Sequence, residues 1–506
     1  MTVPMKAGAA AFIKKSAKVV NQVIKGRGNG SNGGDNFNYY HPLPGPTGFP
    51  VLGHLPLIDS VAPHLTLNKW ARIYGPVYKL KFGLIPAVVL SDPSIIAQAF
   101  SKPQSTGRPP LFVTTGIMEG NGIISVDGAL WKEQRRMVIH CLRQLEDLKT
   151  AQGKSDLDKL IEENVDSIVE KFGRHGESTF DVHPLIRFVI SNMMSKIVFG
   201  RSYSEDDSEY SRQLDLCDMG SNLVQMTNWV NYFPGLRHVF HFHDAYEALK
   251  SSKTEHHEFL MRILQQQIYR KRDSPSAVID FYIKEMFKNE YNVDDPATRN
   301  QMIHLLADVF GSASDTIKLT LKWALLHLVA RPDIQEKVQY ELDSVVGRGR
   351  NPTIDDMFAL PYTTATVLEA NRMANVTPLG LPHWTLDDMP LSYYLIPKGT
   401  MIISLLYAVH MDPNYWQCPV LFMPERFLDE SRNVVKPFQF MPYSYGQRNC
   451  FGEHLAEKTL FLLIAHILHR FTLEYPTEGE EPDFRPMPGF TVSPRIYKLK
   501  AIHRPN

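Results

Sequence analysis

The chain has 506 residues, of which 43% are hydrophobic and 21% are charged, so it can bury a large core as one large domain or as two. Lysine plus arginine equals aspartate plus glutamate at 54 each, so no overall field recruits nucleic acid or an acidic partner. Four widely separated cysteines argue against a disulfide framework and a zinc site, and suit reduced thiols: Cys141, Cys217, Cys418 and Cys450.

Residues 1–38 are predicted to form a basic segment and a glycine-rich linker. The first 34 residues contain six lysines and arginines and no acid, with apolar residues at helical spacing. This pattern is typical of a transit peptide or of a helix lying on an anionic membrane surface, and a disordered basic tail is the alternative. No apolar run in the sequence reaches the roughly 18 residues that a membrane-spanning helix needs.

A single large domain is expected over residues 39–506. The segment Pro42–Gly53 is too rich in proline for a helix or a central strand and marks its start. Most of the remaining chain has the apolar spacing of helices, so the fold class is mainly α with a small β region. Short runs typical of strands are found at Val77–Phe82, Ala87–Leu90, Leu395–Ile396 and Met401–Ser404.

Trp131 and Arg135 are spaced i, i+4 on a helix that is predicted to begin near Asp127. Basic residues on the same helix are candidates to meet an acidic protein, with a solvated helix face as the alternative: Lys132, Arg136 and Arg143.

Histidines further along the chain raise the question of a metal site: His238, His241 and His243, followed by His256 and His257 between Glu255 and Glu258. The spacing gives no ordered helical set of three ligands, and histidine clusters in surface loops are common. A metal site is therefore disfavoured in this segment.

The segment Asp308–Leu328 is predicted to be a long helix that contains small and hydroxylic residues at its centre, Gly311–Thr316. Such residues ordinarily weaken a helix, so their presence indicates either a function or a kink filled by small side chains. Within this stretch, Asp315 and Thr316 supply an acid next to a hydroxyl.

Glu369 and Arg372 are spaced i, i+3 in a further helical stretch, where a carboxylate and a guanidinium can pair. On its own this spacing has little weight, because most such pairs are exposed and contribute well under ~1 kcal/mol.

The segment Pro442–Gly452 presents one cysteine, Cys450, in a loop punctuated by glycines and followed by an apolar helical pattern. The glycines are expected where a side chain would clash, and the helix N-terminus is expected to lower the pKa of the thiol. A buried structural cysteine is the general alternative. The loop favours a thiolate presented to a metal.

This loop resembles the haem-binding signature of the cytochrome P-450 superfamily, which runs Phe, two residues, Gly, one, Arg, one, Cys, one, Gly. Five residues fall on that signature, with tyrosine where the family usually has phenylalanine: Tyr443, Gly446, Arg448, Cys450 and Gly452. The resemblance begins at the Pro/Gly segment and runs nearly to the C-terminus. It implies the cytochrome P-450 fold, with haem b between a long distal helix and a proximal Cys-loop helix.

The resemblance also implies roles for single residues. Cys450 becomes the axial ligand of the iron. Asp315 and Thr316 become the catalytic pair that feeds protons to activated oxygen, with Ala313 and Ile317 as departures from the usual pattern. Four residues are implied to hold the haem propionates: Trp131, Arg135, His383 and Arg448. Three others are implied to form a buried structural triad: Glu369, Arg372 and Arg426.

The implied function is a haem-thiolate monooxygenase that inserts one atom of dioxygen into a bulky hydrophobic substrate, with a steroid as the candidate. Its electrons come from a separate protein, NADPH-cytochrome P-450 reductase, or a ferredoxin in a mitochondrial enzyme. Candidate substrate walls are 110–118, Phe310 and Gly311, Leu379 and 490–492.

Local motifs resemble the microsomal-type group that includes arthropod ecdysteroid hydroxylases: Gly107–Pro110, Pro382–His383 and Cys450–Glu453. The expected location is the cytosolic face of the endoplasmic reticulum membrane, with the mitochondrion as the alternative. Two other functions stay open: a haem-thiolate isomerase or dehydratase acting on a peroxide, and a non-catalytic haem-containing binding protein.

Overall fold

The computed structural model describes residues 40–117, 119–148, 155–223, 225–270, 275–476, 482–487 and 489–505. The basic segment and linker expected over residues 1–38 lie outside the described residues, so the domain boundary at residue 39 stays a prediction.

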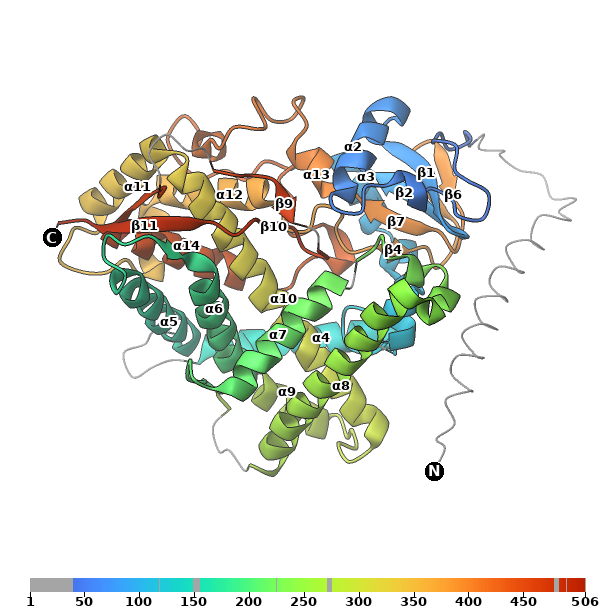
Figure 1. Cartoon of the computed structure of the whole chain (residues 1–506), viewed down its shortest axis with the longest axis horizontal. Coiled ribbons are helices and arrows are strands. Elements are labelled where there is room, and N and C mark those ends of the chain that lie inside the picture. Colours follow the sequence, from blue (N-terminus) through green and yellow to red (C-terminus); the bar gives the residue numbers. More distant parts are fainter. Residues whose placement is uncertain are drawn as a thin grey trace, which may run out of the picture.

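Helices make up most of the described chain, which confirms the expected fold class (Figure 1). In chain order they are α2 (Pro63–Tyr74), α3 (Pro93–Phe100), α4 (Gly128–Asp147), α5 (Asp156–Gly173), α6 (Val182–Phe199), α7 (Ser208–Leu223), α8 (Phe240–Tyr269), α9 (Val278–Lys288), α10 (Pro296–Val329), α11 (Pro332–Val345), α12 (Pro361–Ala374), α13 (Leu406–His410) and α14 (Glu453–Arg470).

The predicted strands all form, and three of the four fall in one mixed sheet. Its strand order is β1-β2-β7-β4, from β1 (Val77–Phe82), β2 (Ile85–Leu90), β7 (Met401–Ser404) and β4 (His383–Trp384). β2 and β7 run parallel, so two segments far apart in the sequence meet in this sheet beside α2 and α3 (Figure 1).

The other strands form three small sheets. β3 (Phe180–Asp181), β11 (Lys498–His503) and β8 (Phe471–Glu474) make one; β9 (Pro486–Met487) pairs with β10 (Ser493–Pro494), and β5 (Met389–Leu391) pairs with β6 (Tyr394–Ile396).

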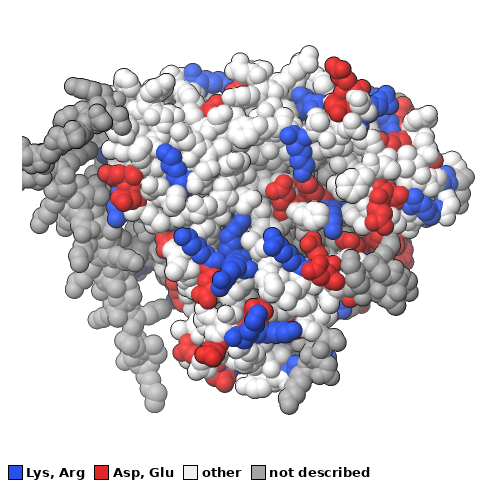
Figure 2. Space-filling model, turned by 180° about the vertical axis from the view of Figure 1, so that it is seen from behind, with Lys and Arg blue, Asp and Glu red and all other residues white. Residues whose placement is uncertain are grey.

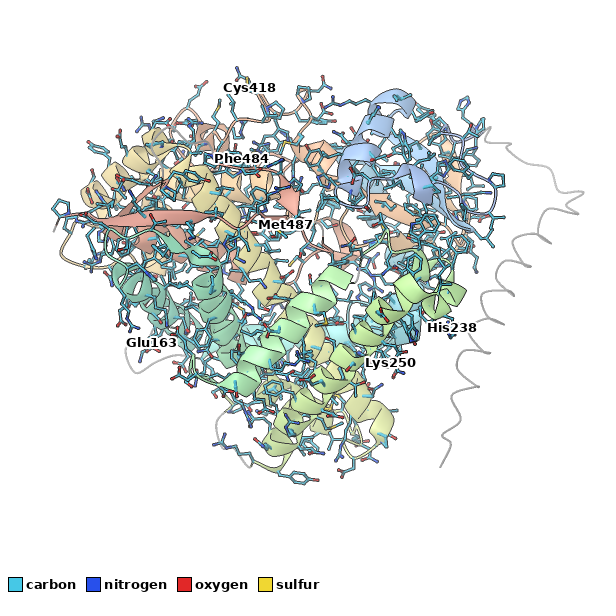
Figure 3. All side chains as sticks on the ribbon, viewed as in Figure 1. Glu163, His238, Lys250, Cys418, Phe484 and Met487 are labelled. Carbon is cyan, nitrogen blue, oxygen red and sulfur yellow. The ribbon has the colours of Figure 1, made fainter. Side chains whose placement is uncertain are left out.

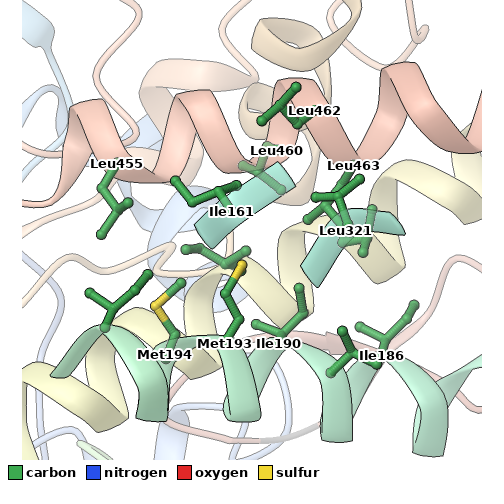
Figure 4. Packing of buried hydrophobic residues seen from close by; sticks show 14 of the residues in the cluster. Ile161, Ile186, Ile190, Met193, Met194, Leu321, Leu455, Leu460, Leu462 and Leu463 are labelled. Atoms are coloured by element: carbon green, nitrogen blue, oxygen red, sulfur yellow. The ribbon is translucent and has the colours of Figure 1, made fainter. Parts of the chain in front are cut away.

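The long helix α10 is buried along most of its length and passes through the middle of the helical part. Its first turn is capped by Asp295, whose carboxylate accepts a hydrogen bond from the Thr298 amide at 2.8 Å. α14 and α6 pack against α10, and α5 packs against α14 and α6; Figure 4 shows Leu460, Ile161 and Met193 in the same apolar layer. Each fully buried side chain of this kind contributes about 1.5–3 kcal/mol. The packing fixes the position of α10 relative to α14.

Among the helices of the described chain, none is both long enough and apolar enough to cross a membrane.

Candidate functional site

The cysteine loop leads directly into α14, whose N-cap is Gly452. The backbone amide of Cys450 donates to the carbonyl of Tyr443 at 3.0 Å, which closes the loop. Gly446 has φ +80°, and a Cβ there would lie 2.1 Å from the carbonyl oxygen of Phe100, so only glycine fits. At Gly452 the expected clash is not met by protein atoms, because a Cβ would make only an ordinary contact of 3.9 Å with the Cys450 sulfur.

The pKa of the Cys450 thiol is raised rather than lowered. Burial is the largest cause, and it outweighs the opposite effects of the Gly452 amide, the Arg135 guanidinium and the Glu453 amide. The predicted lowering of the Cys450 pKa was therefore wrong. The amides at the start of α14 do lower this pKa, as expected, but burial raises it by more. Metal coordination deprotonates such a thiol outright.

One cavity of about 490 Å³ connects the cysteine loop to α10. Cys450 and Phe451 line it on the loop side, while Phe310, Asp315 and Thr316 line it on α10. Apolar side chains make up most of its wall. A sulfur and an acid beside a hydroxyl therefore face one shared space.

Three arginines stand at the edge of this cavity without a carboxylate partner in the described part of the chain: Arg108, Arg135 and Arg448. Burial and the neighbouring guanidiniums lower the pKa of Arg448 to about 8 and that of Arg108 to about 10. Arg448 is buried and the other two arginines are partly buried, so three like charges this close are costly unless an anion is bound between them. The cluster is therefore suited to a group that bears more than one negative charge.

Backbone carbonyls hold two of these arginines in place. Arg448 donates to the carbonyls of Thr106 and Val126, at 2.6 Å each. Arg108 donates to the carbonyl of Pro382 at 2.8 Å. Trp131 lies with its indole 4.2 Å from the Arg448 guanidinium, so it supports that arginine and lines the neighbouring hollow on the outside of α4.

His383 lies beside the same cluster on β4. Its Nδ1 bonds to the carbonyl of Ser105 at 2.7 Å, and its ring stacks on Phe100 with centroids 3.8 Å apart. Burial, together with Arg108 and Arg448, holds the pKa of His383 well below its ordinary value, so the ring is neutral at pH 7.

Asp315 is not a free acid but the centre of a polar network. Its Oδ2 accepts a hydrogen bond from the Thr491 hydroxyl at 2.6 Å, and its Oδ1 lies 3.2 Å from the Lys318 ammonium. The hydroxyl of Thr316 donates to the carbonyl of Ser312, one turn earlier in α10, at 2.8 Å.

Lys318 links that acid to the neighbouring helices. Its ammonium donates to Asp218 of α7 at 2.7 Å, and Asp218 in turn pairs with Arg187 of α6 at 2.8 Å. Although burial opposes the charge, the carboxylates of Asp315 and Asp218 outweigh it and raise the pKa of Lys318. The network ties α10, α7 and α6 together at the cavity wall.

Comparison with known proteins gives the family. The family model described as Cytochrome P450 matches residues 43–501. The chain belongs to the cytochrome P450 family.

Among the relatives is cytochrome P450 18a1 of Drosophila melanogaster, which is 32% identical over 91% of this chain and 87% of its own length. Cytochrome P450 2J3 of Rattus norvegicus is 33% identical, over 91% of both chains. A farnesoate epoxidase of Bombyx mori is 29% identical, over 90% of this chain and 92% of its own length.

Haem b, bound through a cysteine thiolate, is the cofactor of the cytochrome P450 family, and the cavity fits it. The sulfur of Cys450 stands on one wall, and the three guanidiniums that lack a carboxylate partner offer positive charge for two propionates. Arg108 is an addition, since only Arg135, Arg448, Trp131 and His383 were expected to serve the propionates. Arg108 lies in the Gly107–Pro110 motif. In the sequence this motif indicates the microsomal-type group but not a role for Arg108 in binding haem.

Tyr443, which stands where the signature usually has phenylalanine, adds a hydroxyl that needs a hydrogen-bond partner. It is buried and makes no hydrogen bond of normal geometry within the described residues. Burial is the main cause that raises the pKa of this hydroxyl well above its ordinary value, and Asn371 opposes the rise only weakly. Tyr443 lines the cavity together with Asn371.

The three residues expected as a triad meet in the interior of this cytochrome P450. Arg372 binds both oxygens of Glu369 at 2.7 Å, and Arg426 reaches Glu369 at 3.1 Å. Glu369 and Arg372 are fully buried. Trp416 packs against both guanidiniums, with centroid distances of 5.2 and 5.8 Å.

The histidines weighed as a metal site are not brought together. His238 lies at the edge of the molecule beside the start of α8 (Figure 3), and the His243 ring bonds to the backbone of Arg237 at 3.0 Å. The side chain of His241 lies outside the described part. Over the described residues, no group of three potential ligands could hold a metal ion.

Only part of the expected substrate wall lines the cavity of this cytochrome P450. Phe310, Gly311, Phe490 and Thr491 line it. Leu379 instead packs in the apolar cluster beside the mixed sheet. Of the segment 110–118, residues Phe112, Val113 and Ile117 pack against the α8 region, and Met118 is outside the described residues.

Proposed function

We propose that this monooxygenase oxidises a bulky, largely apolar substrate held between α10 and the haem, with Cys450 as the axial ligand. The observation that carries the proposal is the shared cavity, which Cys450 lines on one side and Asp315 and Thr316 on the other. Haem supplies the oxygen chemistry when bound, while the protein positions the substrate and moves protons.

Asp315 and Thr316 are proposed to deliver those protons. The Asp315 carboxylate is held by Thr491 and Lys318, so it stays at the cavity wall instead of turning into solvent. Two departures make the same wall more apolar, since Ala313 and Ile317 replace residues that are smaller or hydroxylic in the family pattern. Neither removes the acid or the hydroxyl.

A steroid-like molecule is the proposed substrate class. The mostly apolar wall favours a bulky hydrophobic ligand. The local motifs that resemble ecdysteroid hydroxylases support a steroid, whereas the similarity to a farnesoate epoxidase would support an isoprenoid.

NADPH-cytochrome P450 reductase is the proposed electron donor. Lys132, Arg136 and Arg143 project from one face of α4 and line a hollow of about 750 Å³ outside the haem cavity. Arg135 lines both spaces, so the hollow lies directly behind the cysteine side. Figure 2 shows the face turned away from α7 and α8, where lysine and arginine side chains gather near the centre. An acidic protein surface is complementary to such a site.

Attachment to the cytosolic face of the endoplasmic reticulum membrane is also proposed. Phe49, Val51 and Leu84 expose 51%, 63% and 61% of their surface. They are neighbours, because Gly53 pairs with Phe82 and the Gly83 amide donates to the carbonyl of Leu52 at 3.2 Å. An exposed apolar patch that follows a basic N-terminal segment in the sequence suits a lipid surface.

Replacement of Cys450 by serine tests the core of the proposal. We expect the purified, reduced and carbon-monoxide-treated variant to lose the red-shifted Soret band of a thiolate ligand and to lose turnover with NADPH and reductase. Cys418, which is exposed on a distant loop, gives the matched control Cys418→Ser, with an unchanged band (Figure 3). Retention of the band and of turnover in Cys450→Ser would refute the assignment. Turnover of a lipid hydroperoxide without NADPH would favour an isomerase instead.

A further inference from the structure

Two histidines face each other at the end of the cavity that lies along the first half of α10. His257 of α8 and His304 of α10 have ring centroids 4.3 Å apart, at an interplanar angle of 84°. Both line the cavity. His304 is only 3% exposed, and its Nε2 makes no hydrogen bond with any residue that the structure describes. A buried polar atom of this kind calls for a partner, which a ligand or a water supplies.

Lys253 and Glu119 form an ion pair beside these histidines, and their two charges cancel. The ammonium of Lys253 lies 2.8 Å from the carboxylate of Glu119, which also accepts a hydrogen bond from Asn300 at 3.0 Å. Burial, followed by Lys253, lowers the pKa of His304 to about 4. Burial and His304 lower the pKa of His257 to about 3. Both imidazoles are therefore neutral at pH 7 and each offers one donor and one acceptor.

No cation on the described cavity wall is left over for a negatively charged substrate. Arg187 and Lys318 are held by Asp218 and its neighbours, and Lys253 is held by Glu119. The remaining cations are the three arginines assigned to the haem propionates: Arg108, Arg135 and Arg448. A buried carboxylate beside His304 would thus carry an uncompensated charge.

The geometry of α10 sets the length of a ligand that reaches this end. His304, Asp308, Gly311 and Asp315 follow one another at helical spacing and all line the cavity. At 1.5 Å per residue, His304 lies about 16 Å from Asp315 along the helix. A steroid with a side chain, or a long aliphatic chain, spans that distance.

We propose that His257 and His304 form a recognition site for a hydroxyl group at the end of a neutral, otherwise apolar substrate, remote from the carbon that is oxidised. The proposal rests on the proposed function, whose substrate class it narrows. A hydroxyl donates one hydrogen bond and accepts others, which matches a neutral imidazole, whereas a carboxylate only accepts. Sites built to bind a hydroxyl reject analogues that lack it far more strongly than apolar pockets reject a changed methylene.

Three ligands of one chain length test the site: tetradecanol, tetradecane and tetradecanoate. Their dissociation constants are measured from the ligand-induced Soret shift of the haem-loaded protein, after the carbon monoxide band has confirmed loading. We expect the wild type to bind tetradecanol most tightly. His304→Leu should weaken tetradecanol about tenfold, the equivalent of about 1.4 kcal/mol, and leave tetradecane unchanged. If His304→Leu does not load haem, His257→Leu replaces it in the test, because His257 is less buried. This variant should also weaken tetradecanol binding about tenfold and leave tetradecane binding unchanged.

His243→Leu is the matched control, because it changes an exposed histidine of the same helix α8 whose ring bonds to the Arg237 backbone. It should leave all three constants unchanged. The inference fails if the alcohol keeps its preference over the alkane in both variants, or if tetradecanoate binds more tightly than tetradecanol to the wild type. Absence of any Soret shift with all three ligands would count against the proposed substrate class as well as the histidine site.

Discussion

At the scale of single residues, two lysines on α10 show how burial and pairing compete. Lys318 is buried but pairs with Asp315 and Asp218, and its pKa is raised. Lys322, four positions later, is also buried and forms no ion pair in the described part of the chain. Burial, then the charge of Lys318, lowers the pKa of Lys322 to about 8. The first lysine stabilises the wall of the cavity, and the second costs free energy.

Lys318→Met should destabilise the protein and uncouple its turnover. Two carboxylates lose their shared cation, at a cost of about 2–3 kcal/mol, less than for a fully buried pair because Asp218 is 37% exposed. Asp315 then loses one of the groups that hold it at the cavity wall, so less product should form per NADPH consumed. Chemical denaturation and product-to-NADPH ratios measure the two effects.

Lys322→Met is the matched control. A folded-state pKa below the ordinary value of 10.5 means that stability is lost as the pH falls through that range toward about 8. The methionine variant should therefore be the more stable protein at pH 7, and its advantage should vanish above about pH 10.5. Unchanged coupling in Lys318→Met, with a loss of coupling in Lys322→Met, would contradict the role given to Lys318.

Local spacing in the sequence was enough to single out residues that the structure places at the cavity wall or in the cysteine loop. Cys450 and Gly446 lie in one short loop, and Asp315 and Thr316 are adjacent, so their pattern is visible in the chain. Local spacing did not single out Lys318 with Asp218, or His257 with His304. Those pairs join positions far apart in the sequence, and only the packing of α10 against α7 and α8 brings them together.

At the scale of elements, the turns beside the mixed sheet carry the exposed apolar patch formed by Phe49, Val51 and Leu84. The strands β1 and β2 could be predicted because β1 alternates apolar residues with lysines and β2 is a short, mostly apolar run. The patch could not, since it needs the bridge between Gly53 and Phe82 that folds the preceding loop onto the hairpin.

Val51→Glu with Leu84→Glu should weaken binding to vesicles of phosphatidylcholine and phosphatidylserine at least tenfold. Each substitution removes an apolar side chain from the lipid and adds a negative charge. Flotation of the full-length protein with vesicles measures the change. Phe358→Glu is the control, because Phe358 is 97% exposed but lies beside α12, away from the hairpin. Equal flotation of the wild type and the double variant would exclude this patch as the contact with lipid.

At the scale of the whole molecule, the structure separates the cavity along α10 from the basic hollow on α4. The substrate cavity extends along α10 toward α8, while the basic hollow opens on the outer side of α4. Arg135 lines both the cavity and that hollow, and Trp131, which lines the hollow, packs on Arg448 of the cavity wall. An electron donor that binds the hollow would thus approach the haem from the cysteine side without blocking the substrate.

Lys132→Glu with Arg143→Glu should raise the KM for NADPH-cytochrome P450 reductase about tenfold and leave kcat at saturating reductase unchanged. Both side chains are exposed on one face of α4, so the change should alter docking and its dependence on salt, with no effect on folding. Lys398→Glu, an exposed charge on the turn before β7, is the control. If the double variant and the wild type have the same KM for the reductase, the docking site does not include this face of α4.

The parallel pairing of β2 with β7 has a consequence for how the protein is made. Ala87 pairs with Met401, so the first half of the mixed sheet leaves the ribosome long before its partner strand. At about 5–20 residues per second, that delay is on the order of tens of seconds. During this time the β1–β2 hairpin has one edge open to solvent and to other chains. The β2 edge of the nascent hairpin therefore stays available for pairing with another chain until Met401–Ser404 has been synthesised.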